Sequence, residues 1–167
     1  MTTNTAVADN PTVPERCCPP FDPDPWQDRE LTWDKKLFVT DHVTAFCHIP
    51  LNITSKVTQN VAQMETAGAL TPDFMMLSDE SSLWGSEIYL SATRPVPNAK
   101  MAEFSGTFLT KVFEGPYQNA GKWCRTMQAY VKSKGKTIQK IYFYYTTCPK
   151  CARAYGKNYV VLFAQVG

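Results

Sequence analysis

Two cysteines, Cys148 and Cys151, stand in the segment CPKC at a spacing that zinc knuckles and dithiol redox sites share. A structural zinc needs four ligands, and this segment supplies two of them. The second pair would have to be Cys17 with Cys18, or Cys47 with Cys124. A redox-active pair usually lies at a helix N-terminus, whereas this pair lies between two segments of strand-like composition. We therefore interpret CPKC as a turn between strands, with Cys148 and Cys151 as metal ligands in the alternative.

Glu87 is the first candidate for proton transfer. It opens an alternating segment in which Tyr89 falls on the same face of the expected strand. A carboxylate in that position could pair with a cation or act as a general base on water. The nearby Asp79 and Glu80 belong to the run DESS, whose composition is common in turns. We interpret these two as turn residues.

His48 and Glu114 are the second and third candidates. Each stands two residues before a proline, at the end of an expected strand. Because the two surrounding segments resemble each other, we expect both side chains to face one groove. An imidazole and a carboxylate in one groove suit acid–base work near neutral pH.

The chain is rich in aromatic residues that could line a ligand site. Most aromatics on strands lie in the core, but each buried tyrosine hydroxyl needs a hydrogen-bond partner. Some of these rings are therefore expected around a semi-polar cavity, where they could stack on a flat ligand or face a cation. The predicted ligand-binding residues are Trp84, Tyr89, Tyr117, Trp123, Tyr142, Tyr144 and Tyr155.

Composition narrows the classes of function. The chain has 167 residues, 44% of them hydrophobic, which suffices for one well-filled core without structural disulfides. A net charge of +2 gives no sign of a nucleic-acid or membrane partner. The first residues lack the apolar run of a signal peptide, so we expect a cytoplasmic protein, monomeric or homodimeric. No P-loop, dinucleotide fingerprint or nucleophile elbow is present.

The elements that must position these residues occur twice in the chain. Two segments, VTAFCHIPLNITSKV and LTKVFEGPYQNAGKW, each read as a strand that ends at a proline and continues into a helix. The helices are expected at about 53–67 and 119–133, each followed by a glycine suited to a helix C-terminus. Further strands are expected at about 74–77, 87–94, 140–147 and 158–165.

The repeat predicts an α+β fold of duplicated strand-helix-strand-strand units related by a pseudo-twofold axis. One antiparallel sheet would carry two helices, with a ligand cleft between the halves. We expect a flexible N-terminal arm at 1–30, which is rich in Pro and Asp, and a single domain at 31–167. Its halves would span about 35–94 and 101–167.

Three segments of the sequence resemble the gyrase-inhibitor-like (GyrI-like) effector-binding family. They are FLTKVFEGPYQNAGKW, GSEIYLSAT and NYVVLFAQV. The resemblance implies an aromatic-lined central cleft with an acidic residue, which receives bulky, often cationic or polycyclic molecules. Some members of the family hydrolyse reactive natural products. Unlike the regulators of the family, this chain lacks a helix-turn-helix segment.

Three hypotheses of function follow. In the first, the protein binds a hydrophobic or polycyclic molecule and hydrolyses it without a cofactor, with Glu87 or Glu114 activating water and His48 or a tyrosine protonating the leaving group. In the second, it binds or sequesters such a molecule without turnover, including a tetrapyrrole with His48 as axial ligand. In the third, the CPKC pair makes it a zinc- or thiol-dependent protein.

Overall fold

The computed structural model describes residues 18–47 and 49–167, and these contain the following elements. The strands are β1 (Arg29–Phe46), β2 (Ile49–Pro50), β3 (Met76–Asp79), β4 (Gly85–Ser91), β5 (Met101–Glu114), β6 (Ile138–Tyr145) and β7 (Tyr159–Val166). The helices are α1 (Ile53–Thr66), α2 (Ala120–Ser133) and α3 (Pro149–Tyr155), with a 3-10 turn, η1 (Tyr117–Asn119), before α2. No helix in this part of the chain is both long and apolar enough to cross a bilayer.

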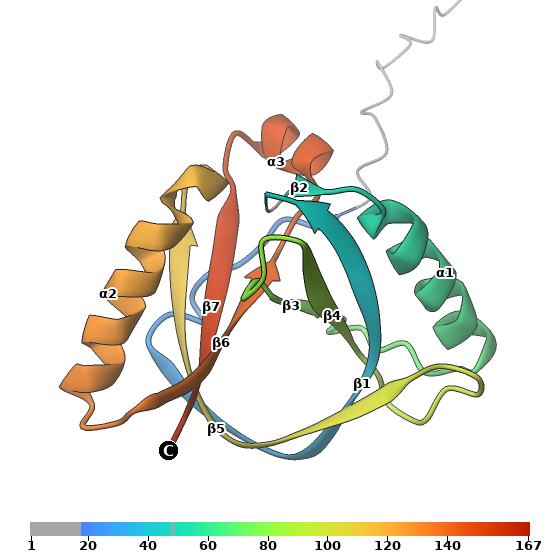
Figure 1. The fold of residues 1–167 in the computed structure, drawn as a ribbon, viewed down its shortest axis with the longest axis horizontal. Coiled ribbons are helices and arrows are strands. Elements are labelled where there is room, and N and C mark those ends of the chain that lie inside the picture. Colours follow the sequence, from blue (N-terminus) through green and yellow to red (C-terminus); the bar gives the residue numbers. More distant parts are fainter. Residues whose placement is uncertain (1–17, 48) are drawn as a thin grey trace, which may run out of the picture.

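The strands form one antiparallel sheet in the order β2-β1-β4-β3-β6-β7-β5, and β1 also pairs with β5. This extra pairing closes six of the strands into a barrel-like ring. The order is symmetric, because a twofold operation exchanges β1 with β5, β4 with β7 and β3 with β6. Figure 1 shows α2 at the left and α1 at the right of the molecule, with the strands between them. The predicted duplicated α+β fold is therefore confirmed.

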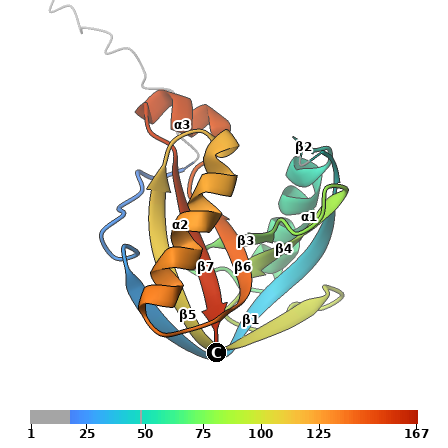
Figure 2. The same ribbon diagram turned by 60° about the vertical axis from the view of Figure 1, so that its left-hand side comes forward.

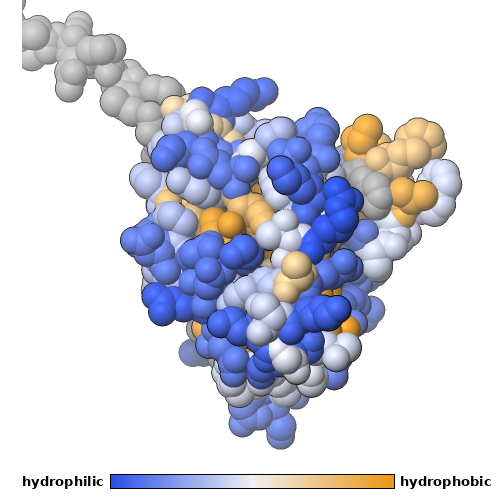
Figure 3. All heavy atoms as spheres, turned by 90° about the vertical axis from the view of Figure 1, so that its left-hand side faces the viewer, coloured by the Kyte–Doolittle hydropathy of each residue, from blue (hydrophilic) through white to orange (hydrophobic). Residues whose placement is uncertain are grey.

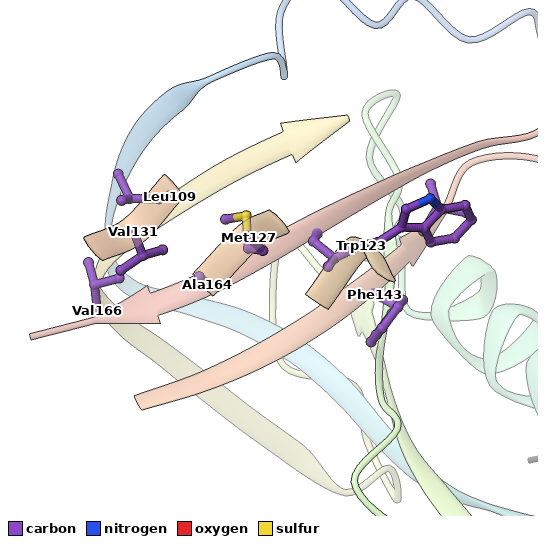
Figure 4. Packing of buried hydrophobic residues seen from close by; sticks show 9 residues of the cluster. Leu109, Trp123, Met127, Val131, Phe143, Ala164 and Val166 are labelled. Atoms are coloured by element: carbon purple, nitrogen blue, oxygen red, sulfur yellow. The ribbon is translucent and has the colours of Figure 1, made fainter. Parts of the chain in front are cut away.

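Helix α2 packs on the sheet through residues spaced four apart. Trp123, Met127 and Val131 are buried and contact β5, β6 and β7, as Figure 4 shows. Burying a side chain of this size stabilises the fold by about 1.5–3 kcal/mol. The helix ends before Gly135, whose φ of 70° is the left-handed conformation expected after a helix. The predicted helices at 53–67 and 119–133 match α1 and α2 closely.

The face of the sheet opposite α1 and α2 carries an aromatic cluster, which we call the inner cluster. Its rings come from all parts of the chain: Phe38, Phe104, Phe108, Phe163, Tyr89, Tyr142, Tyr144 and Trp33. Residues before β1 join it, because Trp26 lies 5.6 Å from Phe163 between ring centroids, and Phe21 lies 6.1 Å from Tyr144. Residues 18–28, the described part of the chain before β1, are thus packed onto the domain through Phe21 and Trp26.

The segment after β6 differs from the prediction. The expected turn at CPKC is the start of a short helix, α3, with Cys148 as its N-cap and Pro149 in its first turn. Gly156 ends it with a φ of 68°. Proline favours turns and first helical turns alike, so its presence did not distinguish the two. Ala152 and Ala154 favour a helix, and Gly156 favours its termination at that point.

Candidate functional site

Four residues form a polar group where the two halves meet, and we call them the junction cluster: Ser78, Glu80, Tyr117 and Tyr145. The Ser78 hydroxyl donates to Glu80 Oε1 at 2.6 Å, and the Tyr145 hydroxyl donates to the same oxygen at 3.1 Å. Glu80 and both tyrosines are half-buried. Among the described residues, none donates a hydrogen bond to the second oxygen, Oε2.

The pairing of β3 with β6 brings these groups together. Ser78 lies opposite Phe143 in this antiparallel pairing, and the Glu80 side chain bonds both to Ser78 and, across the pairing, to Tyr145. Since side chains alternate along strands, Tyr145 shares the helix-side face with Phe143. Tyr117 approaches from η1, with its ring centroid 6.0 Å from that of Tyr145. Each half of the repeat therefore contributes to the cluster.

Both tyrosines of the cluster remain protonated. Burial raises the pKa of Tyr145 far above its ordinary value of 10.0, and the charge of Glu80 raises it further. The pKa of Tyr117 is also raised, mainly by burial and then by Glu80, against an opposing hydrogen bond with Tyr145. The two hydroxyls thus act as neutral hydrogen-bond donors beside a carboxylate, in a mainly aromatic setting.

Glu87 lies in a second polar group. Its Oε1 is 2.7 Å from His42 Nδ1, because strand pairing places His42 directly opposite Glu87. Both residues line a cavity of about 320 Å³, whose remaining lining is mostly polar and comes from β1, α1 and residues 98–100. His42 is well exposed, with 58% of its side chain accessible. Sequence reasoning missed His42, since only the register between β1 and β4 reveals it.

Asp79, predicted as a turn residue, ends β3 and is nearly buried. Its Oδ2 lies 2.6 Å from Lys140 Nζ. Burial alone would raise the pKa of Asp79, but hydrogen bonds from Lys140 and Ser81 outweigh that effect and the pKa is lowered. This ion pair links β3 to β6 next to the junction cluster.

The aromatic residues predicted to bind ligand lie in several different parts of the structure. Tyr89, Tyr142 and Tyr144 lie in the inner cluster, and Trp123 is buried beneath α2. Tyr117 alone of the predicted set belongs to the junction cluster. Tyr155 donates to the backbone carbonyl of Cys18 at 2.6 Å.

Trp84 belongs to an exposed group of hydrophobic side chains on the β1–β2 end and the β3–β4 loop. The members are Phe46, Ile49, Leu51, Leu83 and Trp84. In Figure 3, hydrophobic side chains stand out as a projection at the upper right of the molecule. The rings of Trp84 and Phe46 lie 5.7 Å apart between centroids.

The remaining predicted residues do not join the junction cluster. Glu114 is exposed at the end of β5, opposite Tyr159. His48 and Cys17 lie outside the described residues. Cys148 and Cys151 are accompanied by Cys18, and their three sulfur atoms all lie within 4.8 Å of one another. Cys124 lies on α2, where burial raises the pKa of its thiol.

Several solved structures share this fold. The C-terminal domain of EcmrR is 10% identical with a TM-score of 0.60, over 85% of this chain and 98% of that chain. An uncharacterized conserved protein from Listeria innocua is 12% identical with a TM-score of 0.62, over 84% and 92% of the two chains. A hydrolase from Listeria innocua is 12% identical with a TM-score of 0.60, over the same shares.

Sequence comparison identifies the family. No curated protein matches the chain. A family model described as a bacterial hydrolase matches residues 8–166, which is almost the whole chain. The protein is therefore a member of the bacterial hydrolase family, built on a GyrI-like fold.

Proposed function

We propose that the protein binds an apolar or polycyclic small molecule at the junction cluster and hydrolyses it with water activated by Glu80. The observation that carries the proposal is the half-buried Glu80 carboxylate, which two hydroxyls hold by one oxygen while the other stays open. Membership of the bacterial hydrolase family supports the reaction class. The resemblance to the GyrI-like family supports the class of ligand.

The residues divide the work of hydrolysis as follows. Glu80 Oε2 takes a proton from water while the water oxygen forms a bond to an electrophilic carbon of the substrate. The bond between that carbon and the leaving atom breaks, and Glu80 then passes the proton to that atom. The neutral hydroxyl of Tyr117 stabilises the developing negative charge by a hydrogen bond. The reaction consumes one water molecule and requires no cofactor.

The aromatic surroundings argue for a flat, apolar substrate. The rings of Tyr117, Phe143 and Tyr145 lie within 6.4 Å of one another between neighbouring centroids. Such rings contribute stacking and apolar contact area. A cationic substrate would also benefit from the carboxylate and the ring faces.

Three matched variants test the assignment of Glu80. The purified protein is incubated with a panel of polycyclic dyes and strained-ring electrophiles, and mass spectrometry detects products that have gained one water. We expect Glu80→Gln to lower turnover by about 10²–10⁴-fold, the range typical of a lost general base. Glu87→Gln and Glu114→Gln make the same change elsewhere and should retain activity.

Other outcomes would contradict the proposal in distinct ways. Full activity in Glu80→Gln would remove Glu80 from the mechanism, and loss of activity in Glu87→Gln would move the site to the His42 cavity. Tight binding of the panel compounds without any product would show that the protein binds these molecules but does not hydrolyse them. Quenching of tyrosine and tryptophan fluorescence measures that binding independently of turnover.

A further inference from the structure

A group of three thiols lies outside the junction cluster. Cys18 comes from the segment before β1, whereas Cys148 and Cys151 come from the start of α3, and their sulfur atoms lie within 4.8 Å of one another. Among the described residues, this is the one group of three or more metal-binding side chains that could hold an ion. Figure 2 shows α3 at the same end of the molecule as the beginning of the described residues.

Backbone amides donate hydrogen bonds to two of the three sulfurs. The Cys148 amide donates to Cys18 Sγ at 3.4 Å, and the Cys151 amide donates to Cys148 Sγ at 3.5 Å. Hydrogen bonds of this kind stabilise the negative charge of a thiolate, which is the form that binds metals. The Tyr155 hydroxyl donates to the backbone carbonyl of Cys18 at 2.6 Å. The sulfurs of Cys18 and Cys148 are therefore oriented by their surroundings, as metal ligands usually are.

The spacing of the sulfurs suits a tetrahedral ion. A zinc–sulfur bond of about 2.3 Å places two sulfurs of a tetrahedron about 3.8 Å apart. Contraction by about 1 Å at most would bring the three thiols to that distance. Soft thiolate ligands favour zinc over magnesium or calcium, and the burial of Cys151, only 2% exposed, suits a structural site.

We propose that Cys18, Cys148 and Cys151 bind one zinc ion, which fastens the segment before β1 to α3. The three thiolates would supply three of the four ligands of a tetrahedral zinc ion. Metal binding releases the thiol protons as the thiolates form. The ion adds a second attachment to the packing of Phe21 and Trp26 on the inner cluster. The proposed site is independent of the junction cluster and of any activity there.

Metal analysis of the purified protein tests the proposal. The protein is prepared with a non-chelating reductant, given excess zinc and desalted, and its metals are counted by mass spectrometry. We expect about one zinc per chain. Cys18→Ser, Cys148→Ser and Cys151→Ser should each weaken zinc binding by more than about tenfold in competition with a chelating dye. Cys47→Ser and Cys124→Ser are the matched controls and should bind zinc as the wild type does.

Cobalt gives a second measurement that does not depend on activity. Substituted for zinc, it should produce the intense thiolate-to-metal absorption of tetrahedral sulfur ligation, which Cys18→Ser should lower. Cys18 lies outside the sheet, so this variant tests the site even if substitution of the buried Cys151 impairs folding. Absence of zinc in the wild type, another metal in its place, or equal zinc in the Cys18→Ser and Cys124→Ser variants would overturn the proposal.

Discussion

Two hydroxyl groups donate to the same carboxylate oxygen of Glu80, and this arrangement gives the two oxygens different roles. Oε1 is held by Ser78 and Tyr145, so the carboxylate keeps one orientation. Oε2 is left for a molecule that comes from outside. A flexible carboxylate on a loop would lose conformational entropy when it orients a water, whereas this one is oriented in advance.

Removal of the Tyr145 hydroxyl tests this orientation. A hydrogen bond to a charged group contributes about 1.5–3 kcal/mol, so Tyr145→Phe should lower kcat/KM by about 10–100-fold. Binding of apolar ligands should change little because the ring stays. Tyr144→Phe is the control, since its side chain points to the inner cluster on the opposite face. Equal activity in the two variants would exclude a role for the Tyr145 hydroxyl.

The ion pair between Asp79 and Lys140 predicts a dependence of stability on pH. Since the pKa of Asp79 in the folded state lies below its ordinary value of 3.8, the pair stabilises fully above pH 3.8. Its contribution is lost as the pH falls through the folded pKa. Asp79→Asn should therefore lower the free energy of unfolding by about 1–3 kcal/mol at neutral pH, and by less in acid.

Urea unfolding at several pH values measures this difference. Asp73→Asn serves as the control, because Asp73 is exposed and its carboxylate forms no ion pair with a described residue. A deficit of Asp79→Asn that stayed constant down to pH 3 would contradict the assignment.

At the scale of elements, the packing of α2 depends on a few fully buried side chains. Met127 has no exposed surface and packs from α2 against the sheet. Met127→Ala should create a cavity and lower the free energy of unfolding by about 2–5 kcal/mol. Gln128→Ala, one residue along on the exposed face, should change it by less than about 0.5 kcal/mol. Thermal or denaturant unfolding measures both, and comparable losses would show that α2 does not pack in this way.

Helices α1 and α2 could be predicted because their signals are local. Each helix has apolar residues at helical spacing and a glycine just after its end, at position 68 for α1 and 135 for α2. All the residues that signal one helix therefore lie within one short continuous segment. Helix α3 was instead predicted as a turn, because its seven residues are too few to show a helical period. The duplicated architecture followed from the similarity of two segments that lie far apart in the chain.

The candidate site was predicted only in part, because it depends on pairing between distant strands. Tyr117 was expected from its place beside the proline joint. Glu80 was interpreted as a turn residue, since its partner Tyr145 lies 65 positions away and only the folded chain, in which β3 pairs with β6, brings the two side chains together. The pairing of His42 with Glu87 depends in the same way on β1 and β4. Sequence patterns give the face of a residue but not its neighbour across the sheet.

At the scale of the whole molecule, the two halves meet along two boundaries of unequal length. Strands β1 and β5 pair from Arg29 to Val39, whereas β3 and β6 pair only at Leu77 and Ser78. Short pairings open more readily than long ones. The adjacent Leu77 and Ser78 amides point to opposite neighbouring strands. The one that donates to β6 should therefore exchange faster than the paired part of β1. Slower exchange at β3 than at β1 would contradict this order.

Under the proposed function, the short boundary between β3 and β6 also couples ligand binding to the stability of the barrel. Glu80 belongs to one half and Tyr117 and Tyr145 to the other, so a molecule bound between them bridges the weaker boundary. By mass action, such a ligand shifts the equilibrium toward the closed ring. The protein would then be most resistant to proteolysis and heat when its substrate is abundant, and its lifetime in the cell would follow the supply of that substrate.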